Sequence, residues 1–152
     1  MYSLNSGVKS DVKVRNFEAG PQKDFYQHWL GVKGERILPA SNDLDPEYMA
    51  DYISQIILID YHEKDDEFSF RLMDQDLREI LEELSEQDLK EGSSRLNLFD
   101  SFKWCIENKE PYYSKHNIEL AFKDYSNYSS VVYPLSDNNK DVTNLVLVVH
   151  LN

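Results

Sequence analysis

The chain has 152 residues, of which 41% are apolar, and this length suits one domain with a single hydrophobic core. Its 16 basic and 28 acidic side chains give a net charge of −12, which repels phosphate backbones and anionic lipid headgroups. Nucleic acid and membrane surfaces are therefore not expected as partners. The only cysteine, Cys105, excludes an internal disulfide framework, and no apolar stretch has the length of a signal peptide or a membrane span. We expect a protein of the reducing cytoplasm.

The polar segment 1–20 is expected to form a flexible N-terminal arm, and one domain is expected over 21–152. In the segment 22–32 the apolar residues follow helical spacing. The apolar stripe of this helix consists of Phe25, Trp29 and Leu30. It must be covered either by the domain's own sheet or by the same helix of a second subunit. A second helix is predicted over 46–53, where an aspartate precedes a proline at the first helical position.

The segment 56–62 is β-branched and apolar on both faces, which is typical of a strand in the middle of a sheet. The alternation over 68–73 predicts its partner strand, and the charged residues between the two predict a hairpin turn. Over 74–91 the apolar residues change to helical spacing with glutamates on the opposite side, which indicates an acidic amphipathic helix. Another helix is predicted over 97–108, and Pro111 prevents its continuation.

Three strand-like segments follow, over 112–122, 126–135 and 142–151, and the short polar turns between them predict an antiparallel meander. The expected fold class is α+β, with a five-stranded antiparallel sheet, helices packed on one face and an N-terminal flanking helix. A half-open sheet of this kind holds ligands or partners more often than it performs catalysis.

Two strands, a helical excursion and three strands form the plan of a PAS-type sensor domain. The chain resembles the small, single-domain PAS-like proteins that are common in alphaproteobacteria, over about 25–151. The first matching segments are Phe25-Tyr-x-x-Trp-Leu, Leu38-Pro39, Asp45-Pro46 and Ile56-Ile-Leu-Ile-Asp. The later ones are Phe68-x-Phe-Arg-Leu, Glu110-Pro111 and Tyr133-Pro-Leu-Ser-Asp.

The resemblance implies a regulatory domain that binds a small ligand or a protein partner in signal transduction, without catalytic residues. A small, mainly apolar pocket is expected between the sheet and the helices. The residues expected to line it are Phe70, Leu72, Trp104, Cys105, His116, Ile118 and Tyr133. PAS-like domains often dimerise through a flanking helix, so the stripe of Phe25, Trp29 and Leu30 is the candidate interface of a homodimer.

No cofactor or metal site is predicted, and the identity of any small ligand stays open. Flavin-binding PAS sensors carry their reactive cysteine in an Asn-Cys-Arg-Phe segment, which Trp104-Cys105-Ile106 does not match. Cys105 lies on an apolar helical stripe, as a small buried side chain does. The four histidines lie on separate elements without the spacing of a zinc site, and none has a pattern that supports haem ligation. The segment 137–141 imitates the start of a calcium loop but lacks its glycine and terminal glutamate, so an ordinary turn is expected.

Three functions remain open from the residues. The first is a non-enzymatic PAS-like sensory domain with an unknown ligand and an unknown protein partner. The second is a pure protein-interaction subunit whose core is filled by side chains. The third is a small isomerase or dehydratase on a cone-like α+β fold, for which His116 on the inward face of its strand is the candidate acid or base.

Overall fold

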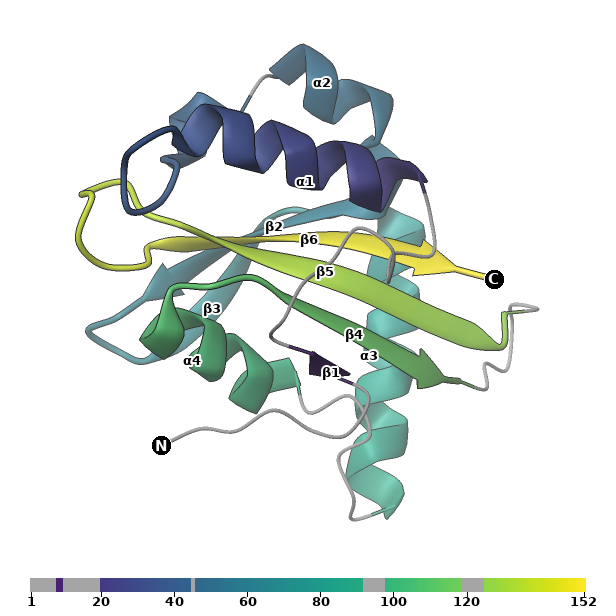
Figure 1. The fold of residues 1–152 in the computed structure, drawn as a ribbon. Helices are drawn as coiled ribbons and strands as arrows, with labels where there is room; N and C mark the ends of the chain where they lie inside the picture. Colours follow the sequence, from purple (N-terminus) through teal and green to yellow (C-terminus); the bar gives the residue numbers. More distant parts are fainter. Residues whose placement is uncertain (1–7, 10–19, 45, 92–97, 119–124) are drawn as a thin grey trace.

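The protein is an α+β fold with one antiparallel sheet between two sets of helices (Figure 1). This computed structural model describes residues 8–9, 20–44, 46–91, 98–118 and 125–152. The helices are α1 (Gly20–Lys33), α2 (Pro46–Asp51), α3 (Gln75–Glu91) and α4 (Leu98–Asn108), with two short 3-10 helices, η2 (Ser41–Asp43) and η3 (Ile53–Gln55). The strands are β1 (Val8–Lys9), β2 (Ile56–His62), β3 (Glu67–Leu72), β4 (Tyr112–Asn117), β5 (Asn127–Leu135) and β6 (Asn144–Leu151).

The sheet joins a hairpin to a meander. Its strand order is β1-β4-β5-β6-β2-β3, with every neighbouring pair antiparallel. The hairpin β2–β3 meets the meander β4–β5–β6 where β2 pairs with β6, in a register that sets Ile56 opposite Val148 and Asp60 opposite Asn144. The most apolar strands therefore lie in the middle of the sheet, while β3 and β4 lie toward opposite edges.

Helices cover both faces of the sheet, which corrects the expectation that they pack on one face. In the view of Figure 1, α1 and α2 lie above the sheet and α4 lies below it. On the upper face, the ring of Tyr133 packs against Phe25 and Trp29 of α1, with centroids 5.0 Å and 5.7 Å apart. On the lower face, Trp104 of α4 meets Tyr112 of β4 edge to face, with centroids 6.2 Å apart. Because successive strand residues point to opposite faces, these contacts identify which residues belong to which layer.

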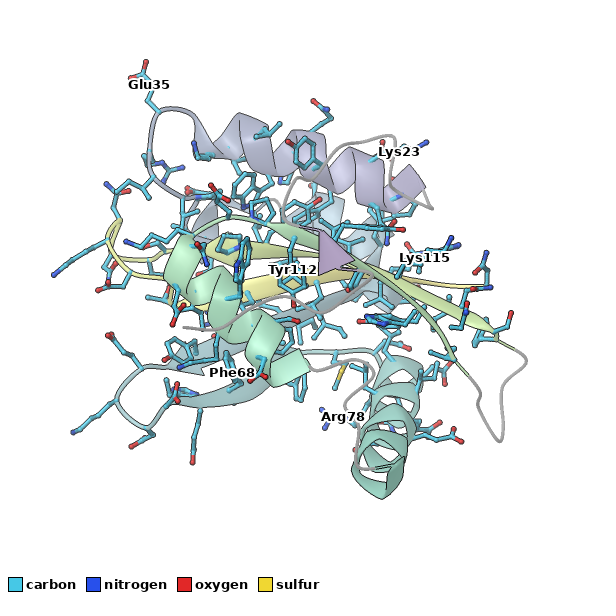
Figure 2. All side chains as sticks on the ribbon, turned by 60° about the horizontal axis from the view of Figure 1, so that its bottom comes forward. Lys23, Glu35, Phe68, Arg78, Tyr112 and Lys115 are labelled. Carbon is cyan, nitrogen blue, oxygen red and sulfur yellow. The ribbon has the colours of Figure 1, made fainter. Side chains whose placement is uncertain are left out.

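The turn of the β2–β3 hairpin is attached to α4 by a buried lysine. Lys103 of α4 is only 8% exposed, and its Nζ donates a hydrogen bond to the Tyr61 hydroxyl at 3.0 Å and forms an ion pair with Asp66. The same ammonium group lies over the Tyr61 ring, 5.0 Å from its centroid. We call these three residues the α4 clamp. In Figure 2, Phe68 of the same hairpin and Tyr112 of β4 lie on either side of α4.

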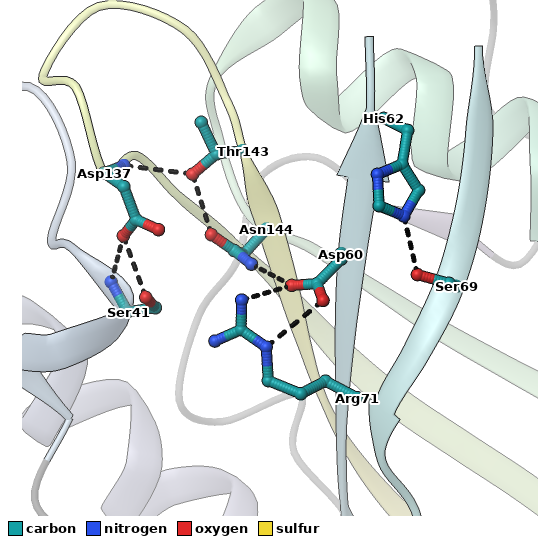
Figure 3. A network of polar contacts seen from close by, with 8 residues as sticks. All are labelled: Ser41, Asp60, His62, Ser69, Arg71, Asp137, Thr143 and Asn144. Carbon is teal, nitrogen blue, oxygen red and sulfur yellow. Dashed lines mark hydrogen bonds and ion pairs between the residues drawn. The ribbon is translucent and has the colours of Figure 1, made fainter. Parts of the chain in front are cut away.

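A chain of polar contacts connects the loop after α1 with the β5–β6 turn and the β2–β3 hairpin (Figure 3). Ser41 donates from its backbone N–H and its hydroxyl to Asp137, each at 2.8 Å, and the Asp137 N–H donates to the Thr143 hydroxyl at 3.0 Å. Thr143 donates to Asn144 at 2.7 Å, and Asn144 donates to Asp60 at 2.5 Å. The ion pair between Asp60 and Arg71, 2.6 Å long, completes the chain. It links η2, the β5–β6 turn and the hairpin.

The predicted helices and strands are largely confirmed. The helices expected over 22–32, 74–91 and 97–108 are α1, α3 and α4, and the expected central strand is β2. The helix expected over 46–53 ends as α2 at Asp51, after which η3 leads into β2. The strand expected over 112–122 is described as β4 up to Asn117, and residues 119–124 lie outside the described part of the chain.

The segment expected to be a flexible arm requires one correction. Val8 and Lys9 form β1 and pair with Ser114 and Tyr113 of β4, so these two residues extend the sheet. Gly20 already belongs to α1. Residues 1–7 and 10–19, the remainder of the expected arm, lie outside the described part of the chain.

Candidate ligand-binding site

Five hydroxyl-bearing residues gather between α4 and the meander. The register sets Tyr112 opposite Val132, Ser114 opposite Ser130 and His116 opposite Tyr128, and directly opposed residues share one face of a sheet. Two tyrosines on this face are therefore separated by a pair of serines, and α4 adds Ser101, which lies close to Tyr112. We call this set the hydroxyl cluster: Ser101, Tyr112, Ser114, Tyr128 and Ser130.

The two serines satisfy each other. Their hydroxyl oxygens lie 3.0 Å apart across β4 and β5, which is a hydrogen-bonding distance, and both side chains are buried. Ser101 and Cys105 of α4 are buried and lie close to Tyr112, so this helix covers the Tyr112 end of the cluster.

The other three hydroxyls are buried without a hydrogen bond. The hydroxyls of Ser101, Tyr112 and Tyr128 have no partner among the residues that the structure describes. Both tyrosines are at most 1% exposed, so solvent does not substitute for the missing partners. An unpaired buried hydroxyl costs about 1–3 kcal/mol, and most native proteins satisfy such groups with protein atoms or ordered water. Three of them in one place therefore indicate unused hydrogen-bonding capacity.

Burial keeps both phenols protonated. Burial is the main reason why the pKa of Tyr112 lies well above its ordinary range, and interactions with Cys105 and Tyr128 raise it further. Burial likewise raises the pKa of Tyr128 to about 12. The nearby Ser101 and Ser130 hydroxyls offset part of these rises, but neither contact has the geometry of a hydrogen bond to the phenol. At neutral pH the cluster presents neutral O–H groups.

Cys105 lies in the cover of the cluster as a packed thiol. It is completely buried, and its Sγ donates a hydrogen bond to the backbone oxygen of Glu110 at 3.2 Å. Burial raises the pKa of the thiol well above its ordinary value, which disfavours the thiolate that nucleophilic chemistry requires. The expected role of Cys105 as a small buried side chain is confirmed.

The residues predicted to line one pocket do not meet in one place. Trp104 and Cys105 belong to α4, His116 belongs to β4, and Ile118 follows directly after β4. The centroid of the His116 ring lies 6.3 Å from that of the Tyr128 ring. Phe70 and Leu72 belong to β3, which the strands β5, β6 and β2 separate from β4 by roughly 19 Å. Phe70 is also 49% exposed. The sequence could not reveal this separation, because it depends on the non-local pairing of β2 with β6.

Tyr133 requires a second correction, because it lies on the other face of the sheet. It is five residues after Tyr128 on β5, an odd spacing, so the two side chains point to opposite sides. Its hydroxyl donates to the backbone oxygen of Gln22 in α1 at 3.4 Å. Tyr133 therefore supports α1 and does not line the space beneath α4.

The stripe predicted as a dimer interface is covered by the protein's own sheet. Phe25 and Trp29 are buried against β5, and the indole N–H of Trp29 donates to the backbone oxygen of Pro134 at 3.2 Å. These two residues are therefore not available to a second subunit. Leu30, at 41% exposed, is the one member of the predicted stripe that reaches the surface.

Sequence reasoning missed the hydroxyl cluster. It selected His116 and Ile118 from the strand expected over 112–122, and none of the five residues of the hydroxyl cluster was among the residues expected to line the pocket. The available signal was the repeated Tyr-x-Ser pattern, which occurs as Tyr112-Tyr113-Ser114 and again as Tyr128-Ser129-Ser130 on two paired strands.

A hollow lies away from the cluster. It has a volume of about 350 Å³ and is formed where η3, the start of α3 and the end of β6 meet. Its described lining residues are Ser54, Gln55, Asp74, Asp76, Leu77, Ile80, Tyr125, Val149, His150 and Leu151. None of the residues predicted for the pocket belongs to it.

The turn that imitates a calcium loop is confirmed as an ordinary turn between β5 and β6. The side-chain oxygen of Asn138 accepts hydrogen bonds from the backbone N–H groups of Lys140 and Asp141, at 2.9 Å and 2.8 Å. Across the described ranges, no group of three or more histidine, cysteine or acidic side chains is placed to hold a metal ion. No helix within these ranges has both the length and the apolar character to cross a lipid bilayer.

Comparisons with known proteins found no match for this chain. No family model matches the chain, and neither does any curated protein or solved structure. The arrangement of strands, helices and buried hydroxyls therefore carries the functional argument.

Proposed function

We propose that this protein is a non-enzymatic, PAS-like regulatory domain that binds a small ligand beneath α4 and transmits the binding event to a protein partner. The order of elements supports the PAS-like assignment: a hairpin, two helices and a three-stranded meander follow one another, as the resemblance in sequence implies. Helix α1 plays the part of the flanking helix and covers the opposite face of the sheet.

The observation that carries the proposal is the set of three unpaired hydroxyls in the hydroxyl cluster. They are buried between a helix and a sheet, and a bound molecule would satisfy hydrogen-bonding groups that the described residues leave without partners. Among the residues that the structure describes, Gln22, Trp29 and Tyr133 on the α1 face are all hydrogen-bonded, which favours the α4 side as the ligand site.

Helix α4 supplies a route for the signal. Ser101 and Cys105 lie at the hydroxyl cluster, while Lys103 of the same helix belongs to the α4 clamp on the β2–β3 turn. A ligand with different affinities for two positions of α4 would shift the population between them, and the hairpin turn would follow. The expected output surfaces are the acidic outer side of α3, with Glu79 and Glu82, and the outer side of α1 around Leu30. An acidic surface of this kind favours a basic partner.

Native mass spectrometry of protein purified from its own host tests the proposal. We expect a mass excess that disappears when the protein is denatured, and a higher melting temperature in the preparation that retains the excess mass. The double variant Tyr112→Phe/Tyr128→Phe should lose the bound molecule. The control variant Tyr113→Phe changes a buried tyrosine on the opposite face of the same strand and should retain it.

Two results together would overturn the proposal. One is the absence of any retained molecule in the wild-type protein. The other is an experimental structure in which protein groups satisfy all three hydroxyls. The protein would then be an interaction subunit with a filled core, and partner capture would not depend on a metabolite.

A further inference from the structure

The hydroxyl cluster also indicates the chemistry of its ligand. We infer that it binds a small uncharged molecule through a hydrogen-bond-accepting group, such as a carbonyl oxygen, to which Tyr112 or Tyr128 donates. This inference rests on the proposed function, since it describes the ligand of the same site. It names a class of molecule that the PAS-like resemblance does not specify.

The free hydrogen-bonding groups of the site are the first argument. Ser114 and Ser130 bond to each other, and the Cys105 thiol donates to Glu110. The remaining capacity belongs to the hydroxyls of Ser101, Tyr112 and Tyr128. Because burial raises the pKa of both phenols, each keeps its proton and can donate it. A ligand oxygen can accept a hydrogen bond from either phenol.

The distribution of charge is the second argument. The five residues of the hydroxyl cluster carry no formal charge, and Lys103, the buried cation of α4, is already paired with Asp66 and Tyr61. His116 is the ionisable side chain on the same sheet face, with its ring centroid 6.3 Å from that of Tyr128 and its side chain part-exposed. An ion buried among neutral groups without a counter-ion is strongly disfavoured. Neutral ligands are therefore preferred over carboxylates and amines.

The apolar neighbours of Tyr112 are the third argument. The Trp104 ring packs edge to face against the ring of Tyr112, with centroids 6.2 Å apart. Val132, opposite Tyr112 on β5, is completely buried and apolar. Aromatic and aliphatic neighbours favour a flat apolar body, which leaves the accepting group of the ligand to find the hydroxyls. A small aromatic ketone combines both properties.

Three probes of similar size and different charge test the inference: acetophenone, benzoate and benzylamine. Binding to the full chain would be measured by ligand-observed NMR and by thermal shift at pH 7. We expect acetophenone to bind in preference to both ions. At least one of the variants Tyr112→Phe and Tyr128→Phe should weaken acetophenone binding roughly two- to tenfold, the worth of one neutral hydrogen bond. The matched variant Tyr113→Phe should leave binding unchanged.

The unliganded stability of the same variants separates a ligand role from a structural one. If the hydroxyls of Tyr112 and Tyr128 serve the ligand, removing them should weaken binding without lowering the melting temperature of the unliganded protein. Tighter binding of benzoate or benzylamine than of acetophenone would overturn the inference, as would an unchanged acetophenone affinity in both variants, or no binding of any probe. In each case, the native mass spectrum of wild-type protein decides separately whether the proposed function survives.

Discussion

The two faces of the sheet differ in how completely their polar groups are satisfied. On the α1 face, Gln22 donates to the Ser129 hydroxyl at 3.2 Å and to the backbone oxygen of Val148 at 3.3 Å. Trp29 and Tyr133 also donate to backbone oxygens there. On the α4 face, the hydroxyls of three buried residues have no partner within the described chain. The described polar groups that join α1 to the sheet are therefore hydrogen-bonded, whereas three buried hydroxyls on the α4 side are not.

This difference suggests that one face of the sheet serves mainly stability and the other mainly ligand binding. Buried polar groups that are satisfied stabilise a single arrangement, and buried groups that are not satisfied weaken it. Proteins keep such weak places mostly where a ligand or a conformational change uses them. Changes to the α1 face should therefore affect folding, and changes to the α4 face should affect binding.

The largest expected effect comes from removing the two tryptophans one at a time. Trp29→Ala should destabilise the protein by about 3–5 kcal/mol, because it removes a buried indole and leaves a cavity under α1. Trp104→Ala should cost less, because Trp104 is partly exposed and packs against a less complete layer. Chemical denaturation followed by circular dichroism measures both values. An equal or larger cost for Trp104→Ala would contradict the contrast between the two faces.

A smaller effect, but one with opposite signs, is expected from removing single hydroxyls. Tyr133→Phe removes the bond to the Gln22 oxygen and should cost about 0.5–1.5 kcal/mol. Tyr128→Phe removes a hydroxyl that has no partner, so it should be neutral or stabilise the unliganded protein by up to about 1 kcal/mol. Equilibrium unfolding in urea distinguishes the two. A clear loss of stability in Tyr128→Phe would show that its hydroxyl is bonded within the protein.

The pH dependence should also differ between the faces, because α4 is attached to the hairpin turn through the ion pair of Lys103 with Asp66. The hydrogen bond from Lys103 is the main cause that holds the pKa of Asp66 below its ordinary value. A carboxyl with a depressed pKa contributes stability above its unfolded pKa and loses that contribution as pH falls through the folded pKa, here below about pH 4. Helix α4 should therefore loosen in acid before α1 does.

The ion pair of Lys103 with Asp66 is also expected to lose its contribution to stability at high pH. Burial lowers the pKa of Lys103, but the hydrogen bonds to Asp66 and Tyr61 outweigh it, so the net shift is upward. Its contribution is present below the unfolded pKa and disappears as pH rises through the folded pKa, above about 10.5. The chain has 2 tryptophans, one on each helix, so Trp29→Phe and Trp104→Phe report on α4 and α1 separately by fluorescence. Lys103→Met should abolish the acid response of Trp104, and an unchanged response would exclude the α4 clamp as its cause.

The smallest expected effect is at Cys105. Because burial raises the pKa of its thiol, iodoacetamide should not modify it in the native protein at pH 7, and it should react after unfolding in urea. Mass spectrometry after timed exposure gives the extent of reaction. Rapid native alkylation would mean that the cover of the hydroxyl cluster opens readily.

The local elements of the fold were predictable, because each has a local cause. The apolar spacing over α1 and the alternation along β5 and β6 are readable in the chain, and Pro111 marks the end of α4. The arrangement of the strands was not predictable. The pairing of β2 with β6 joins residues almost ninety positions apart, and it alone places β3 and β4 toward opposite edges.

The candidate site was predicted in part, for the same reason. Trp104, Cys105 and His116 do lie at the α4 side, because helical stripes and strand alternation place them there. Tyr133 was assigned to the wrong face, because the faces of β5 depend on its register with β4. The unpaired state of Tyr112 and Tyr128 depends on three-dimensional neighbours, and no sequence pattern reports it.

The most direct test of the central claim is a high-resolution crystal structure of the protein with acetophenone bound. Our account predicts that the ketone oxygen lies within about 3 Å of the hydroxyl oxygen of Tyr112 or of Tyr128. A structure in which these hydroxyls bond to protein groups, or in which the ketone binds elsewhere, would contradict it.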